Sequence, residues 1–229
     1  MTNKPIISID LWGTLIKPSP SFKEAKYKLV QSYFRHWDIK DIEGRFSTIK
    51  RVADNKVEST GWQPKINWLW SGILLDIIFT SKLQRETILS ELKKNYANLA
   101  IEDSPSLYAD YTKDVLEEMS SRYQLVLSSN TLFLEGWVLK RILDKLDISK
   151  YFTKMNFSDE LGVAKPNKLM YSDSKYHIGD NPITDGDGAW NAGSYPILIN
   201  NDFGSLKTAL NFIERMEKQT NGIAKICGS

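Results

Sequence analysis

The sequence has little cysteine and almost no net charge, and each of these features excludes a class of protein. Its 229 residues include one cysteine, Cys227, so no intrachain disulfide framework can form. This composition fits a reducing compartment, and we expect a cytoplasmic protein. The formal net charge is only +2, with basic and acidic residues mixed along the chain. We therefore expect no nucleic-acid partner.

Long apolar runs are also missing. The longest candidate, residues 73–79, is interrupted by Asp76 and is shorter than the roughly 18 residues that span a bilayer. Residues 1–5 are polar, so the chain does not open with the basic and apolar regions of a secretory signal. We expect no membrane partner. No sequence feature indicates the oligomeric state.

The segment from about residue 21 to residue 98 carries helical patterns only. Within it, apolar residues recur three or four positions apart, with no strand pattern between them. The predicted helices cover residues 22–37, 42–57, 66–80 and 86–96. Pro18 and Pro20 break regular structure just before this region. A run of helices without strands predicts an all-helical insertion.

Beyond Pro105, strand and helix patterns alternate. Strands are predicted at residues 124–128, 154–157, 176–178 and 195–199. Helices are predicted at 107–121, 133–146, after Thr184 and at 204–218. With the apolar strand of residues 6–9, this pattern predicts an α/β fold, a doubly wound Rossmann-like parallel sheet. Residues 1–17 and 103–229 would form this core, and residues 18–102 a helical cap domain over the strand ends, where ligands bind in such sheets.

Four short segments place reactive groups at predicted strand ends or in a loop between them. The first strand runs into Asp10, followed by Leu11-Trp12-Gly13-Thr14, and a carboxylate in this position is a candidate nucleophile. The strand at 124–128 is followed by Ser129 and Asn130, which can donate hydrogen bonds to an oxyanion. Lys165 offers a fixed positive charge. The strand at 176–178 leads to carboxylates five residues apart, Asp180 and Asp185, whose oxygens suit Mg²⁺.

In this order, the segments resemble the four motifs of the haloacid dehalogenase-like hydrolase superfamily. The first motif of that family usually reads Asp-x-Asp-Gly-Thr, and its first Asp attacks a phosphoryl group or a halogen-bearing carbon. The resemblance implies that Asp10 is the nucleophile, with Lys165 and Ser129 also catalytic. It implies a phosphate-binding set of Ser129, Asn130, Lys165 and Thr14. It also implies Mg²⁺ bound by Asp10, the main-chain carbonyl of Trp12, Asp180 and, through water, Asp185.

One departure from the family pattern is Trp12, which replaces the Asp that acts as general acid and base in the family's phosphatases. Because the metal ligand at this position is a backbone oxygen, the metal site is unaffected. The proton carrier is lost, and general acid and base catalysis contributes about 10² to 10⁴-fold, or about 3 to 5 kcal/mol. We expect a hydrolase with Mg²⁺-dependent phosphatase activity on a small phosphorylated metabolite, through an aspartyl-phosphate at Asp10.

Two alternatives stay open. The family's 2-haloacid dehalogenases carry an aromatic Tyr at the position of Trp12, and a departing halide needs no proton. Those enzymes have Ser-Asn in the fourth motif and use no metal, so Asp180 and Asp185 favour the phosphatase. The second alternative is a non-catalytic module of the same fold that binds a phospho-ligand or a protein, because Trp12 is joined by a second departure. The segment between Lys165 and Asp180 is too short for the usual helix and predicts only a turn.

Two further features receive an ordinary structural interpretation. Trp62, Trp68 and Trp70 could line a substrate pocket, but their helical spacing favours a packed cap interior. His177 lies in the strand beside the fourth segment, where we expect a packed or supporting role rather than a catalytic one.

Overall fold

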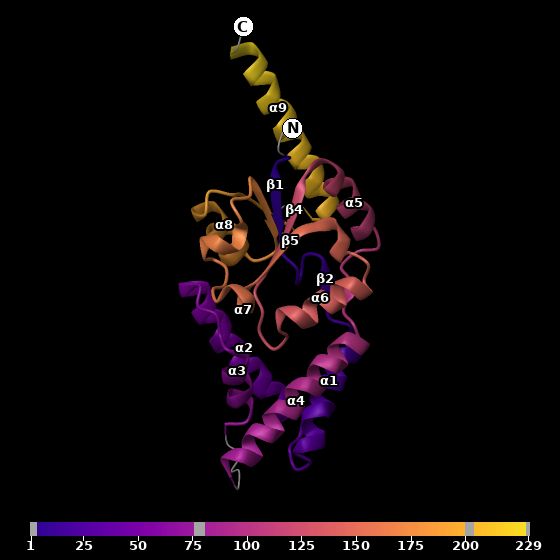
Figure 1. Cartoon of the computed structure of the whole chain (residues 1–229), viewed down its shortest axis with the longest axis vertical. Helices are drawn as coiled ribbons and strands as arrows, with labels where there is room; N and C mark the ends of the chain where they lie inside the picture. Colours follow the sequence, from indigo (N-terminus) through magenta and orange to yellow (C-terminus); the bar gives the residue numbers. More distant parts are fainter. Residues whose placement is uncertain (1–3, 76–80, 200–203, 228–229) are drawn as a thin grey trace.

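The centre of the molecule is a parallel sheet of five strands in the order β5-β4-β1-β6-β7 (Figure 1). The computed structural model describes residues 4–75, 81–199 and 204–227. The strands of the sheet are β1 (Ile6–Ile9), β4 (Gln124–Ser129), β5 (Phe152–Phe157), β6 (Tyr176–Gly179) and β7 (Tyr195–Leu198). This arrangement confirms the α/β class and the Rossmann-like sheet. β1 lies in the middle, with Ile7 and Ile9 fully buried, as an apolar strand covered on both faces should be.

Helices cover both faces of the sheet. α8 (Gly188–Asn191) lies on one side in Figure 1, and α5 (Thr112–Arg122) and α9 (Leu206–Cys227), which contact each other, lie on the other. α6 (Gly136–Lys145) follows β4, and α7 (Ser158–Leu161) follows β5. Three short turns complete the core: the 3₁₀ turns η1 (Ser149–Tyr151) and η2 (Lys168–Tyr171) and the π-helical turn η3 (Pro182–Asp187).

Two predicted helices of the core begin three or more residues later in the structure than the sequence pattern indicates. The helix expected from residue 107 begins at Thr112, because Ser106–Leu107 form β3, which pairs antiparallel with β2 (Ile16–Lys17). Strands of two residues are too short to show periodicity, so the sequence pattern could not reveal this pair of strands. The helix expected from residue 133 begins at Gly136. Between Lys165 and the start of β6 at Tyr176 the structure has only η2, which confirms the shortened segment.

The segment predicted as a cap consists of α1 (Pro20–Tyr33), α2 (Ile39–Thr60), α3 (Ile66–Ile73) and α4 (Lys82–Glu102), drawn at the lower end of Figure 1. Local signals start and stop these helices. Ser19 accepts a hydrogen bond from the amide of Phe22, and Gly61, in the left-handed conformation at φ 65°, ends α2. The last part of the helix predicted over 66–80 lies outside the described residues. The limits of the cap domain stay a prediction.

An aromatic cluster joins the helices of the cap to the sheet domain. Trp70 is fully buried, with its ring 5.8 Å from that of Phe46 and 5.1 Å from that of Tyr96. Phe133, from the loop after β4, packs against the same rings, 5.5 Å from Trp70. Trp70 is therefore interior, whereas Trp68 is 41 % exposed and contacts Trp62 edge to face. Among the described residues, no helix combines the length and the apolar character that crossing a membrane requires.

Candidate active site

Asp10 follows β1 directly, and the edge of the sheet holds it in place. Its backbone amide donates to the carbonyl of Ile178 in β6, at 2.8 Å, so the β1–β6 pairing continues up to the carboxylate. The residue is only 7 % exposed. The sheet thus presents a nearly enclosed carboxylate at the edge where ligands of open parallel sheets bind.

Lys165 lies between two carboxylates. Its Nζ donates to Oδ1 of Asp10 at 2.5 Å and to Oδ1 of Asp185 at 2.6 Å, and it is 1 % exposed. Burial alone would lower the pKa of Lys165, but the two carboxylates raise it above its ordinary value. Burial raises the pKa of Asp10 to about 7, an effect that Asp185 reinforces and Lys165 opposes. Lys165 therefore stays positively charged and favours the ionised form of Asp10, which burial alone would keep neutral.

A third carboxylate, Asp180, completes a cluster suited to a divalent cation. Asp10, Asp180 and Asp185 each offer an oxygen, and these atoms lie within 4.8 Å of one another. Gly13, at φ 79°, makes room for Asp180, because a Cβ at Gly13 would collide with Oδ2 of that carboxylate. Burial raises the pKa of Asp180, and Asp185 adds to this effect. The hard oxygen donors and the excess negative charge fit Mg²⁺.

Asp185 accepts hydrogen bonds at both of its oxygens. Oδ1 accepts from Lys165 and from Nε2 of His177, the latter at 2.9 Å. Oδ2 accepts from the backbone amides of Asp180 at 3.2 Å and Asn181 at 3.0 Å. Burial alone would raise the pKa of Asp185, but Lys165 and His177 hold it well below its ordinary value. Burial lowers the pKa of the His177 ring. Asp185 is therefore an ionised, fully hydrogen-bonded carboxylate in the interior.

The second segment meets the third through Asn130. Oδ1 of Asn130 accepts from the amide of Lys165 at 2.7 Å, and Nδ2 donates to the carbonyl of Lys165 at 3.1 Å. Both ends of this amide thus hold the backbone that carries Lys165, a positioning role that the sequence did not suggest. Ser129 is fully buried, and its hydroxyl has no partner among the described residues. That hydroxyl therefore has unused hydrogen-bonding capacity, and its role in phosphate binding stays a prediction.

The end of α2 and the residues after it touch the site from the cap side. The carbonyl of Gly61 accepts from the amide of Ala164 at 2.9 Å, one residue before Lys165. Glu58 accepts from Nδ2 of Asn181 at 3.0 Å, and Nε2 of Gln63 donates to the carbonyl of Thr131 at 3.3 Å. Sequence reasoning missed these contacts, because no local pattern shows which residues of an inserted domain meet the core.

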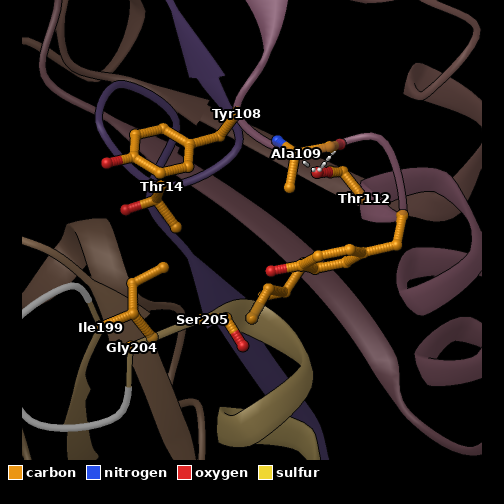
Figure 2. A pocket seen from close by; sticks show the side chains of 9 residues that line it. Thr14, Tyr108, Ala109, Thr112, Ile199, Gly204 and Ser205 are labelled. Carbon is orange, nitrogen blue, oxygen red and sulfur yellow. Dashed lines mark hydrogen bonds between the residues drawn. The ribbon is translucent and has the colours of Figure 1, made fainter.

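Thr14 and Trp12 lie in the tight loop between β1 and β2. Thr14 borders a cavity of about 110 Å³ beside Tyr108 and Thr112, shown in Figure 2, and Asp10, Lys165 and Asp180 are not among its lining residues. The Thr14 hydroxyl is buried without a partner among the described residues. Its predicted contact with phosphate stays a prediction. Trp12 is half-buried and packs against the main hydrophobic core.

Comparison with known families decides the identity of this arrangement. The sequence profile of the haloacid dehalogenase-like hydrolases matches residues 5–189. The chain belongs to this family. The match includes the cap helices and all four motif segments, so the resemblance inferred from the motifs is confirmed. Among curated protein sequences, none matches this haloacid dehalogenase-like hydrolase significantly.

Solved structures share its fold at low sequence identity. YfnB from Bacillus subtilis, a HAD-hydrolase in a structure bound to magnesium, is 16 % identical with a TM-score of 0.66, covering 88 % of this chain and 91 % of YfnB. A HAD phosphatase from Thermococcus onnurineus is 17 % identical with a TM-score of 0.60, covering 91 % and 97 %. A 2-haloacid dehalogenase from Pseudomonas syringae is 13 % identical with a TM-score of 0.60, covering 93 % and 99 %. Both chemistries thus occur on this fold.

Proposed function

We propose that this hydrolase is a Mg²⁺-dependent phosphatase that acts on a small phosphorylated metabolite through Asp10. The observation that carries the proposal is the cluster of three carboxylates around one buried lysine, with one oxygen each of Asp10, Asp180 and Asp185 within 4.8 Å of the others. One lysine does not neutralise three carboxylates, so the cluster favours a divalent cation, and phosphoryl groups bind where such cations bind.

The residues of the chain have distinct parts in the reaction. Asp10 attacks phosphorus, and its new bond to phosphorus forms as the bond to the leaving oxygen breaks. Lys165 and the hydroxyl of Ser129 stabilise the charge on the phosphoryl oxygens. Water then attacks the aspartyl-phosphate, which releases inorganic phosphate and regenerates the carboxylate. Asn130 keeps Lys165 in position throughout by binding both polar groups of its backbone.

The groups that would hold Mg²⁺ are the carboxylates of Asp10 and Asp180 and the main-chain carbonyl of Trp12. When bound, the cation supplies charge neutralisation for the phosphoryl group and the attacking carboxylate. Gly13 is part of this arrangement, since any side chain there would displace Asp180.

Trp12 limits the choice of leaving group. The side chain at this position cannot donate or accept the proton of an alcohol, so the leaving oxygen must depart as an anion or take its proton from water. The loss of general acid and base catalysis costs about 10² to 10⁴-fold. We infer that esters with acidic leaving groups, such as acyl, enol or aryl phosphates, are hydrolysed faster than alkyl phosphates.

The first experiment measures phosphate release from p-nitrophenyl phosphate with and without Mg²⁺. We expect activity that requires Mg²⁺ and that disappears in Asp10→Asn. Asp187→Asn is the matched control, because this carboxylate is exposed, follows Asp185 by two residues and lies outside the cluster of Asp10, Asp180 and Asp185. Activity that survives Asp10→Asn contradicts the proposal.

The second experiment tests Trp12 and the alternatives. In Trp12→Asp we expect faster hydrolysis of alkyl phosphates, with a smaller change for p-nitrophenyl phosphate. Halide release from 2-chloropropionate without added metal would instead identify a dehalogenase, the chemistry of the Pseudomonas syringae structure. A non-catalytic module would release neither product and would form no phospho-enzyme at Asp10.

A further inference from the structure

A line of buried polar side chains extends behind the active site, away from the substrate. His177 in β6 is the register partner of Ser8 in β1, and Nδ1 of His177 lies 2.6 Å from the Ser8 hydroxyl. Ser8 lies 2.8 Å from Ser174, which lies 2.9 Å from Ser194. All four side chains are at most 3 % exposed. The line ends at Asp185, which His177 contacts through Nε2.

The chemistry of each group sets the direction of these hydrogen bonds. An ionised carboxylate only accepts, so Nε2 of His177 carries the proton that it donates to Asp185. In the neutral ring Nδ1 is then an acceptor, and the Ser8 hydroxyl donates to it. With its one proton used, Ser8 accepts from Ser174. By the same reasoning Ser174 accepts from Ser194, so every donor points toward Asp185 and each bond polarises the next.

This line occupies the last free position on the Asp185 carboxylate. A carboxylate accepts at about four lone-pair sites. Lys165, His177 and the amides of Asp180 and Asn181 supply four donors, two at each oxygen. Among the described residues, these bonds leave no site on Asp185 for a water bound to a metal.

We propose that Ser194, Ser174, Ser8 and His177 form a positioning relay that holds Asp185 as the anchor of Lys165 rather than as a metal ligand. The proposal rests on the proposed function for the roles of Lys165 and Mg²⁺, and it refines the ligand set to Asp10, Asp180 and the Trp12 carbonyl. The relay acts at a distance from substrate: it fixes Asp185, Asp185 fixes Lys165, and Lys165 faces the nucleophile.

The proton positions can be read without any activity. The chain has only two histidines, His36 and His177, so a long-range ¹H–¹⁵N spectrum of protein labelled with ¹⁵N-histidine is simple, and His36→Gln assigns it. We expect His177 to carry its proton on Nε2. Ser8→Ala should shift the Nδ1 resonance most, with smaller shifts in Ser174→Ala and Ser194→Ala.

Ser128→Ala is the matched control for these serine variants. Ser128 is as buried as Ser8, but its hydroxyl has no hydrogen-bond partner among the described residues, so its removal should leave the ring nitrogens unchanged. A proton on Nδ1, or equal shifts in all four variants, overturns the relay.

The link to Lys165 is tested in His177→Leu, which cannot donate to Asp185, and His177→Gln, whose amide can. We expect His177→Leu to lower kcat for p-nitrophenyl phosphate by about tenfold or more, because Asp185 loses a charge-assisted hydrogen bond and no longer holds Lys165 in a fixed position. His177→Gln should recover part of this loss. Circular dichroism confirms that each variant is folded.

Direct metal binding separates this proposal from the proposed function. Free Mn²⁺ measured by electron paramagnetic resonance gives the metal affinity of each variant without turnover. We expect His177→Leu to bind Mn²⁺ within about twofold of wild type, because Asp185 contributes no ligand, whereas loss of a supporting group at a metal ligand weakens binding about 10 to 100-fold. A loss of that size overturns the proposal. If wild type hydrolyses no phosphate ester, the proposed function fails, while the spectrum and the Mn²⁺ titration still decide the relay.

Discussion

Replacement of Lys165 by methionine tests the electrostatic account of the site. The change removes the only cation bound to Asp10 and Asp185 among the described residues, yet keeps a side chain of similar length. Breaking a buried ion pair by removing one partner costs about 3 to 5 kcal/mol. For a chain of this size, that loss lowers Tm by roughly 6 to 20 °C.

The assay is thermal and urea unfolding followed by circular dichroism, with Lys140→Met as the matched control. Lys140 pairs with Glu160 at 2.8 Å, but both side chains are largely exposed, so its loss should cost at most about 1 kcal/mol. A Lys165→Met variant as stable as Lys140→Met would refute the account.

The loss of stability with rising pH should also become larger. In the native protein Asp10 already contributes such a loss between about pH 4 and pH 7, because its pKa is raised to about 7. In the native protein the pKa of Asp185 is held below its unfolded value, so its ionisation stabilises the fold above about pH 4 and this contribution is lost as pH falls. Without Lys165, burial raises the pKa of both carboxylates, and stability is lost as pH rises. We therefore expect the gap between wild type and Lys165→Met to be wider at about pH 8 than at about pH 5.

Three further predictions concern the metal site and the cap. Gly13→Ala should lose measurable Mn²⁺ binding, because its Cβ would collide with Asp180. Gly193→Ala is the control: Gly193 has φ 84° and open space around it, so the change should cost only the backbone strain of about 1 to 2 kcal/mol. Trp70→Ala should cost about 3 to 5 kcal/mol of unfolding free energy, and Trp68→Ala, at an exposed ring, distinctly less; urea titration measures both. Mg²⁺ at a hundred times its Kd should stabilise the wild type by about 2.7 kcal/mol, and excess EDTA should abolish the shift in Tm; no shift would argue against the cation site.

The sequence predicted the core because its signals are local. Apolar runs that lead into Asp10, Ser129 and Asp180 identify three buried strands and place these polar side chains at the carboxyl edge of the sheet. The family match confirms this assignment. The π-helical turn and the pairing of β2 with β3 were not predicted, because such short elements have no periodicity. The cap contacts escaped because they join residues far apart in the chain, such as Glu58 and Asn181.

The relay behind Asp185 carried one readable signal. β1 is covered on both faces, yet its central residue is Ser8, and a hydroxyl buried in such a strand needs a hydrogen-bond partner. The sequence shows that need but not the partner, because His177 and Ser174 reach Ser8 only through the pairing of β1 with β6. A buried polar residue in a central strand thus predicts a network and leaves its members to the fold.

The bond from the Ala164 amide to the Gly61 carbonyl has a kinetic consequence. This amide belongs to the residue beside Lys165, yet its acceptor belongs to the end of a cap helix, so its proton can exchange with solvent only when the two separate. The hydrogen-exchange rate of this single amide therefore measures how often the end of α2 separates from the segment that carries Lys165. A ligand that contacts both cap and core would slow that exchange. The hydrogen-exchange rate of this amide therefore reports ligand binding in the site and requires neither a chromophore nor turnover.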